Sequence, residues 1–511
     1  ALCSPDQYFD AHPEYFSEVN GKRQREHTQL CLTNPDVLRI VTSNVLARIR
    51  KDPGADFYGV SQNDWYNFCT CPACKAIDDA EESHAGTMIT FVNQVAEAVE
   101  KEFPNVIIET LAYQYTRKPP KTVKPRRNVM PCLCTIECDF SFPIEKSAFK
   151  ENRAFLDDIR GWSAISPRLY VWDYTTNFRD YVSPFPNILA LQDNVRFFRA
   201  NRVDYLFEQG AYQGRHGDFA ELKAWLLAKW LWNPDLSREP LLEDFFNGYY
   251  GAAAPYVRTY FDALHSFYRD PAERPLRIFE DPRHTQVPDA FYERAAELWR
   301  LAEAAVKASP AHLYNVRMGA IPMLNARLLR QPRRDEIKVW VARDPSRYAI
   351  PAETRALAAE LLARFDEAKN IRLSESSERH QARLDEWRAL AKPAPPPEPR
   401  SRATVEDAAL SLSRPGTWGD TVKDPQAEDG SAIKLYNTHY EWCLTLPFKH
   451  VAFDPGATYR LRMRVRVEKE PGRDGEAFWA GVYDPQDKKS RGGIDRKTSA
   501  VEEGYVWYDV A

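Results

Sequence analysis

Acidic side chains follow several short apolar runs in this sequence. Asp64 comes soon after the run 57–60, and Glu137 and Asp173 follow similar runs later in the chain. Cleavage of a glycosidic bond uses two such carboxyl groups, one protonated to assist the leaving oxygen and one ionised on the other side of the sugar. The pattern therefore predicts that Asp64, Glu137 and Asp173 are catalytic residues acting on a sugar.

Amide and aromatic side chains surround these carboxylates and suit a polyhydroxylated ligand, because aromatic faces stack on sugar rings and amides bond hydroxyl groups. A structural explanation stands beside each functional one. Asp64 could cap a turn, Glu137 could be a buried structural carboxylate, and Glu109, early in its run, is expected to be structural. The predicted ligand-binding residues are Gln62, Asn63, Trp65, Tyr113, Gln114, Trp172, Tyr174, Asn177, Glu208 and Tyr212.

The chain has nine cysteines, and six of them form two clusters. Cys69, Cys71 and Cys74 have the spacing of metal ligands, so a structural zinc site shared with the second cluster (Cys132, Cys134, Cys138) is one interpretation. Disulfides are the other, if the protein is exported. A catalytic thiol is disfavoured for want of a nearby histidine, and neither a catalytic metal nor a cofactor is expected. The remaining cysteines, Cys3, Cys31 and Cys443, stand alone.

The elements that must position these residues alternate along the first half of the chain. Short apolar segments without two-residue alternation are separated by helical ones, which is typical of parallel strands buried on both faces. Six strand–helix units predict an α/β fold, a (β/α)8 barrel whose first units lie upstream of Ala1. An open doubly wound sheet is the alternative, and it lacks a glycine-rich phosphate turn. The expected strands are 29–33, 57–61, 106–113, 128–136, 168–172 and 204–207.

Composition changes along the chain predict further domains. Residues 1–235 are expected to form the N-terminally incomplete barrel, and residues 236–391, with almost purely helical periodicity, a helical region packed on it. The proline-rich segment 392–402 reads as a stiff linker. Two-residue alternation in residues 403–511 predicts a β-sandwich, apparently truncated and a candidate carbohydrate-binding module.

Length and charge exclude several classes of function. The chain has 511 residues and a net charge of −4 with no concentration of basic residues, so no nucleic-acid partner is expected. No apolar run approaches the roughly 18 residues of a membrane span. The expected partner is therefore an oligosaccharide or the glycan of a glycoprotein.

Several longer stretches of the sequence resemble one bacterial family. These are 9–16, 59–64 with the cysteines after it, 111–120, 134–138 and 247–251. They resemble the group called domain of unknown function 4838, part of which is classed as glycoside hydrolase family 163, endo-β-N-acetylglucosaminidases acting on complex N-glycans. The resemblance implies a barrel preceded by a small α/β domain, and export to the periplasm, the cell surface or the medium.

The layout is also remotely similar to two better-known families. In family 67 α-glucuronidases the acid and two further carboxylates follow the fourth, sixth and seventh strands, which by position implies Asp64, Glu137 and Asp173, with Asp64 replacing a glutamate. Family 20 hexosaminidases place an Asp-Glu pair at the fourth strand, where this chain has Asn63-Asp64.

Three functional hypotheses follow. The favoured one is a retaining glycosidase cleaving a β-linked N-acetylhexosamine with the help of the substrate's own acetamide, in which Asn63 and Asp64 divide the orienting and protonating roles. The second is an exo-acting, inverting glycosidase on glycans that contain uronic acid, with Asp64 as acid and Glu137 or Asp173 as base. The third is a glycan-binding protein without catalysis.

Overall fold

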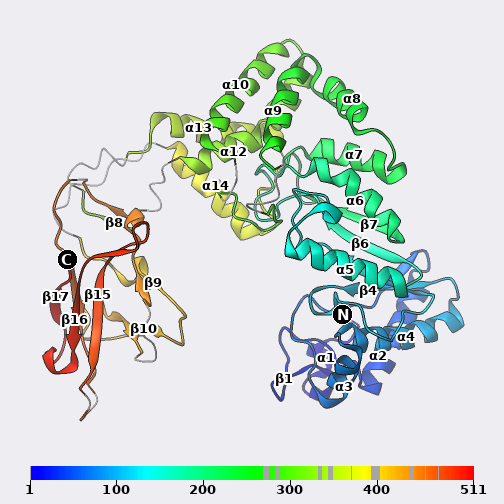
Figure 1. Cartoon of the computed structure of the whole chain (residues 1–511), viewed down its shortest axis with the longest axis horizontal. Coiled ribbons are helices and arrows are strands. Elements are labelled where there is room, and N and C mark those ends of the chain that lie inside the picture. Colours follow the sequence, from blue (N-terminus) through cyan, green and yellow to red (C-terminus); the bar gives the residue numbers. More distant parts are fainter. Residues whose placement is uncertain are drawn as a thin grey trace. The chain divides into compact units, whose positions relative to one another are not determined.

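The computed structural model divides the chain into two compact units (Figure 1). Unit one comprises Ala1–Gln331 and Ala356–Ala391, and unit two comprises Pro332–Arg355 and Lys392–Ala511. All but the first residue of the predicted linker 392–402 lies outside the described residues, and the predicted domain limits stay predictions. The structure describes residues 2–268, 275–283, 287–331, 337–342, 349–369, 371–392, 403–436, 442–454, 456–469, 471–472 and 474–511.

A five-stranded parallel sheet forms the centre of the first half of unit one. Its strands are adjacent in the order of the sequence, which fits the predicted alternation of strands and helices. A half-barrel of this kind is confirmed, and the complete barrel stays a prediction. The strands are β3 (Phe57–Gly59), β4 (Ile107–Ala112), β5 (Val129–Cys134), β6 (Leu169–Tyr174) and β7 (Val203–Gln209).

The first predicted strand, 29–33, is not part of this sheet, so that prediction was wrong. Leu30 forms only an isolated antiparallel bridge with Phe16. The neighbouring side chains have other partners: Gln29 bonds the backbone of the turn at Asn63, and the sulfur of Cys31 faces Cys71. This apolar run is therefore an extended segment whose position is fixed by side-chain contacts and not by pairing within the sheet.

The sheet is strongly curled. The ring of Phe57 on β3 lies 5.7 Å from that of Tyr170 on β6 and 5.4 Å from that of Tyr205 on β7. In a flat sheet with strands about 4.8 Å apart, β3 and β6 would be about 14 Å from each other. Residues in register with Phe57 therefore line a concave face, and the alternate residues point to a convex face.

Helices cover the convex face. Tyr58, Ile108 and Val129 pack into one buried cluster with Val41 of α2 (Pro35–Lys51) and Val92 of α4 (Ala85–Glu102). The predicted start of α2 is confirmed, since the Asn34 side chain accepts hydrogen bonds from two backbone amides and Pro35 occupies the first position. Further along the chain follow α5 (Lys150–Ile165), α6 (Ile188–Ala200) and α7 (Ala220–Trp232).

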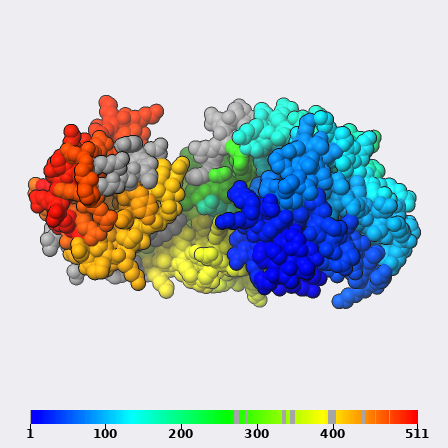
Figure 2. All heavy atoms as spheres, turned by 90° about the horizontal axis from the view of Figure 1, so that it is seen from below, coloured from blue at the N-terminus to red at the C-terminus, as the bar shows by residue number. Residues whose placement is uncertain are grey.

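The N-terminal segment contains α1 (Pro5–Tyr8) and the hairpin of β1 (Glu18–Val19) and β2 (Lys22–Arg23). Figure 2 shows this segment, in dark blue, on the surface of unit one. The rest of the unit is helical: α8 (Arg238–Tyr250), α9 (Ala254–Ser266), α10 (Asp289–Ala305), α11 (Pro310–Gly319), α12 (Ile321–Arg330), α13 (Ala352–Ala368), which begins in unit two, and α14 (Ser377–Ala391).

Unit two is built from short strands, most of them in antiparallel pairs. The exception is the parallel pairing of β8 (Val339–Trp340) with β13 (Val451–Ala452). The described strands form two-stranded sheets, and the predicted sandwich stays a prediction. The other strands are β9 (Ser411–Leu412), β10 (Gly419–Lys423), β11 (Ser431–Leu435), β12 (Leu444–Thr445), β14 (Arg462–Val465), β15 (Glu476–Asp484), β16 (Lys489–Lys497) and β17 (Val506–Asp509).

A search of the described helices for a stretch with the length and apolar character of a membrane span finds none.

Candidate active site

The concave face is rich in aromatic and polar side chains and is partly open to solvent. Phe207, for example, is 41 % exposed. Exposed aromatic faces next to polar groups suit the alternating apolar and hydroxyl surfaces of a sugar. The residues that strand register places on this face include Phe57, Glu109, Cys132, Cys134, Tyr170, Trp172, Tyr174, Tyr205, Phe207 and Gln209.

Asp64 stands at the carboxyl edge of this sheet, in the exposed turn after β3. Its Oδ1 accepts a hydrogen bond of 3.4 Å from Gln114 Nε2. Burial, and then the charge of Asp64, raise the pKa of the Tyr113 hydroxyl above its ordinary value. The structure therefore brings together three of the predicted site residues, Asp64, Tyr113 and Gln114.

Gln114 has two features that are typical of functional positions. Its backbone is left-handed, with φ at 53°, which strains a residue with a side chain. Its Oε1 is buried and has no hydrogen-bond partner in the described part of the chain. The amide is thus held beside Asp64 with one buried acceptor unpaired in the described part of the chain.

The turn that carries Asp64 is held in place by hydrogen bonds from the side chain of Gln29. Gln29 Nε2 donates to the carbonyl oxygens of Asn63, at 2.8 Å, and Trp65, and Gln29 Oε1 accepts from Asn63 N at 2.8 Å. Asn63 Nδ2 in turn donates to the Thr28 carbonyl at 2.8 Å. Asn63, predicted to bind the ligand, therefore has its amide nitrogen engaged in the turn.

Trp65 and Gln62 flank the same turn and differ in availability. Trp65 is 45 % exposed, with its ring centroid 4.0 Å from that of His27. Gln62 is buried, and its amide donates to the Tyr113 carbonyl at 3.1 Å and accepts from Thr116 Oγ1 at 2.6 Å. Trp65 can contact a ligand, whereas Gln62 supports the backbone beneath Tyr113.

Glu137 lies at the same edge of the sheet, after β5. Arg117 Nη1 donates to Glu137 Oε2 at 2.8 Å, and Arg117 Nε donates to Asp158 Oδ2 at 2.7 Å. The Glu137 side chain remains 32 % exposed. The ion pair with Arg117 fixes the position of the Glu137 carboxylate, so Glu137 can offer a negative charge to a ligand at a defined place.

Asp173 and Glu208 occupy a different position from the one predicted. They are paired in register on β6 and β7 and lie on the convex face. Asp173 is fully buried, with Thr135 Oγ1 donating to Oδ1 at 2.5 Å, and both carboxyl oxygens of Glu208 are buried without a hydrogen-bond partner in the described residues. Neither carboxyl can touch a ligand on the concave face, so the geometry favours a structural role.

Burial raises the pKa of Asp173 to about 6 and that of Glu208 well above its ordinary value, the latter helped by the charge of Asp173. Unfolded carboxyl groups titrate near pH 4, so the folded state binds these protons more tightly. The contribution of the pair to stability is therefore greatest below about pH 4 and falls as the pH rises through about 6.

We expect Glu208→Gln to be more stable than the wild type at pH 8 by about 1–3 kcal/mol, because the amide carries no charge and can donate to Asp173. The difference should vanish near pH 4. Denaturant unfolding at both pH values measures it, with the exposed Asp204→Asn on the same strand as control. A variant less stable than the wild type at pH 8 would contradict the raised pKa.

Of the remaining predicted residues, some are placed where they can contact a ligand and one is buried in a structural turn. Trp172 and Tyr174 lie on the concave face, and Trp172 Nε1 donates to Gln209 Oε1 at 2.7 Å. Asn177 is buried in a turn, where its amide donates to the Glu280 carbonyl at 3.0 Å. Tyr212 is 64 % exposed and its hydroxyl donates to Glu375 at 3.4 Å.

Glu109, which the sequence analysis expects to be structural, is a further candidate for the site. It lies on the concave face opposite Gly59, whose lack of a side chain leaves room for the carboxyl group. Ser61 Oγ donates to Glu109 Oε2 at 3.4 Å, and burial raises the pKa of Glu109 to about 7. The sequence did contain a signal for this role, because a charged residue in the interior of a buried strand is costly unless it is paired or functional.

The cysteines do not group as predicted. Cys132 and Cys134 lie on β5, away from the Cys69, Cys71 and Cys74 cluster, which instead meets Cys31. All nine cysteines lie in the described part of the chain, and no two of them are joined by a disulfide.

Comparisons with known proteins match a family and seven chains of solved structures. A family described as "Domain of unknown function (DUF4838)" matches residues 1–262. The solved structure of a GH138 enzyme targeting pectin rhamnogalacturonan II is similar with a TM-score of 0.33 and 10 % identity, over 74 % of this chain and 58 % of that chain. The chain thus spans less than two thirds of that enzyme's structure. No curated protein sequence matches significantly.

Proposed function

This chain belongs to the DUF4838 family, whose match covers just over half of it, and from that premise we propose that it is a glycoside hydrolase. The observation that carries the proposal is the placement of Asp64. Its carboxylate lies at the carboxyl edge of a curled parallel sheet, beside Tyr113, Gln114 and an open aromatic face. Active sites of parallel barrels lie at this edge, because the loops that follow the strands converge there.

The proposed catalytic residues are Asp64 and Glu137. Asp64 is exposed and can reach a glycosidic oxygen, so it is assigned the transfer of a proton to the leaving group. Glu137, ion-paired with Arg117, supplies the negative charge that stabilises a positively charged anomeric carbon.

The preferred substrate is a β-linked N-acetylhexosamine in a complex glycan, as the resemblance to family 163 also implies. In the proposed retaining reaction the acetamide oxygen bonds to the anomeric carbon while the glycosidic bond breaks and the leaving oxygen takes the proton. Water then attacks the anomeric carbon and gives a proton back to Asp64, while the bond between that carbon and the acetamide oxygen breaks. Tyr113 and Gln114 are the groups available to orient the acetamide, because the amide nitrogen of Asn63 is engaged in the turn.

The charges at the site favour a neutral sugar over a uronic acid. Recognition of a uronate carboxylate uses a free arginine or lysine. Of the described residues named above at this edge of the sheet, Arg117 carries the positive charge. Its guanidinium group is already bonded to Glu137 and Asp158. This is why we place the uronic-acid hypothesis second.

The proposal is tested by incubating the protein with glycoproteins bearing complex N-glycans and identifying released sugars by mass spectrometry. We expect release by the wild type and a loss of at least about 10²-fold in Glu137→Gln, because the fixed charge at the anomeric carbon is removed. Glu145→Gln, exposed and paired with Arg160, is the matched control and should retain activity.

Uronic-acid oligosaccharides form a second arm of the experiment. Release from these alone would replace the preferred substrate with the second hypothesis. Tight glycan binding without release from either substrate would overturn the enzymatic proposal in favour of a glycan-binding protein.

A further inference from the structure

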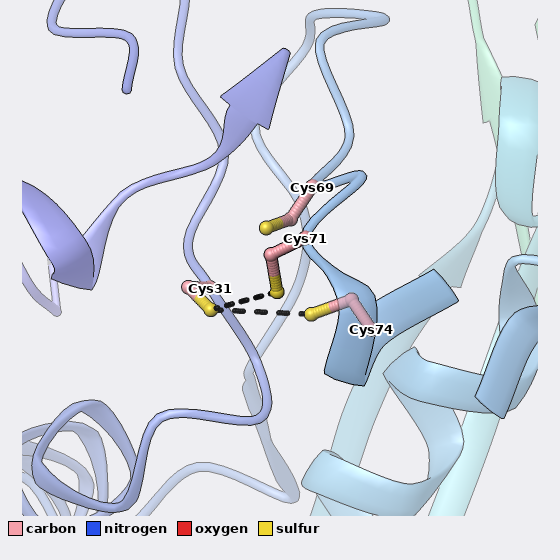
Figure 3. A group of neighbouring side chains, drawn as sticks. All are labelled: Cys31, Cys69, Cys71 and Cys74. Carbon is pink, nitrogen blue, oxygen red and sulfur yellow. Dashed lines mark hydrogen bonds between the residues drawn. The ribbon is translucent and has the colours of Figure 1, made fainter. Parts of the chain in front are cut away.

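Four cysteine side chains from separate parts of unit one converge at one point. Cys31 precedes α2, Cys69 and Cys71 lie in the loop after β3, and Cys74 is in the first turn of α3 (Pro72–Glu81). Their sulfur atoms all lie within 4.8 Å of one another, and all four residues are buried (Figure 3). We call this group the four-cysteine cluster. In the described part of the chain it is the one group of His, Cys, Asp and Glu side chains arranged closely enough to hold a metal ion.

From this geometry we propose that the four-cysteine cluster binds a structural Zn²⁺ ion. Four sulfurs bonded to zinc at about 2.3 Å in a tetrahedron stand about 3.8 Å apart. Cys31 Sγ lies 3.7 Å from Cys71 Sγ and 4.0 Å from Cys74 Sγ, distances that leave room for a central ion (Figure 3). The proposal does not depend on the proposed activity.

Donor groups from outside the cluster approach one of its sulfur atoms, and such donors are suited to a thiolate, the form of cysteine that binds metal. The backbone amide of Glu18 donates to Cys69 Sγ at 3.4 Å, and Arg23 Nη1 lies 3.8 Å from the same sulfur. Cys71 is the N-cap of α3, so the positive end of the helix faces the cluster. Hydrogen bonds from the backbone and a nearby cation are the outer contacts expected around a zinc–thiolate centre.

The ligand set indicates both the ion and its role. Four soft thiolates in a tetrahedron suit zinc, and a site with four protein ligands has no open position for substrate or water. The ion is therefore structural.

The cluster joins the segments that support the candidate site. Cys31 is two residues from Gln29, which clamps the Asp64 turn, and the β1 carbonyl of Glu18 accepts from Thr70 N and Thr70 Oγ1, both at 2.7 Å. Zinc bound to Cys31, Cys69 and Cys71 would fix the segment that carries Gln29 and the loop after β3 relative to each other. Its loss is expected to loosen the loop between β3 and α3.

The test measures metal on the purified, untagged chain. Plasma mass spectrometry of the wild type should find about one zinc per chain, released by a mercurial reagent and detected with a zinc-binding dye. Cys71→Ser should lower the zinc content at least tenfold, and limited proteolysis should then cut the loop 60–71 faster. Cys443→Ser, which lies in unit two, is the control, and this variant should contain as much zinc as the wild type.

A second measurement does not depend on the folding of a variant. Exchange of the wild-type metal for Co²⁺ should give the intense visible bands of a tetrahedral thiolate site. Zinc absent from the wild type, with the four thiols blocked as disulfides, would overturn the proposal. Iron in place of zinc would overturn the identity of the ion, and zinc retained in Cys71→Ser would overturn the ligand assignment.

Discussion

Asp64→Asn is expected to lower kcat/KM for release of the sugar by about 10²–10⁴-fold, the range found when a proton-transferring group is removed. The amide has nearly the same shape, and it can keep the contact with Gln114 Nε2 through its oxygen. The loss should therefore fall on turnover and leave glycan binding within a few fold. Steady-state kinetics and calorimetric titration with the same glycan separate the two effects.

The matched control for this substitution is Asp56→Asn, an exposed aspartate immediately before the same strand. It should leave both turnover and binding unchanged. Equal activity of Asp64→Asn and the wild type would remove Asp64 from the proposed chemistry. Loss of binding together with turnover would instead make Asp64 a ligand-binding residue.

Lys223→Met is expected to destabilise the protein by about 3–5 kcal/mol, the cost of leaving one buried charge without its partner. Lys223 is 4 % exposed, its Nζ donates to the carbonyls of Thr175 at 3.1 Å and Phe185 at 3.0 Å, and Asp218 lies 3.8 Å away. Burial lowers the pKa of Lys223 to about 8, an effect that the charge of Asp218 opposes. Chemical denaturation at pH 7 measures the loss.

Lys229→Met on the same helix provides the comparison. Lys229 is half-buried over the ring of Trp225, so its replacement should cost only about 0.5–1 kcal/mol. The double variant Asp218→Asn with Lys223→Met should recover part of the stability, because it leaves no lone charge. A loss below about 1 kcal/mol in Lys223→Met would contradict the buried pair.

Much of the central sheet could be predicted from apolar runs and turn signals. The runs at 57–61, 106–113, 128–136, 168–172 and 204–207 overlap the five observed strands, and the Asn34-Pro35 start of α2 was readable because a cap is a local interaction. The run 29–33 misled because its apolar character reflects contacts with distant segments and not a place in the sheet. A segment becomes a strand of a sheet only when it pairs with a neighbouring strand, and the local sequence does not show which segment that is.

Sequence alone placed Asp64, Tyr113 and Gln114 at strand ends, and the structure brings them together. It could not decide which way a side chain points on strands buried on both faces, because these lack the two-residue alternation that distinguishes core from solvent. Asp173 and Glu208 therefore appeared as site residues although they lie on the convex face, and Glu109 appeared structural although it lies on the concave one.

The same limit applies to the cysteines. The spacing of Cys69, Cys71 and Cys74 is a property of the sequence, and it was enough to suggest metal ligation. The fourth partner, Cys31, comes from a segment far earlier in the chain, and only packing of the loop after β3 against that segment reveals it. Local signals such as apolar runs, caps and ligand spacing determined the elements, whereas the face of each side chain and the partners of each loop depend on contacts between distant residues.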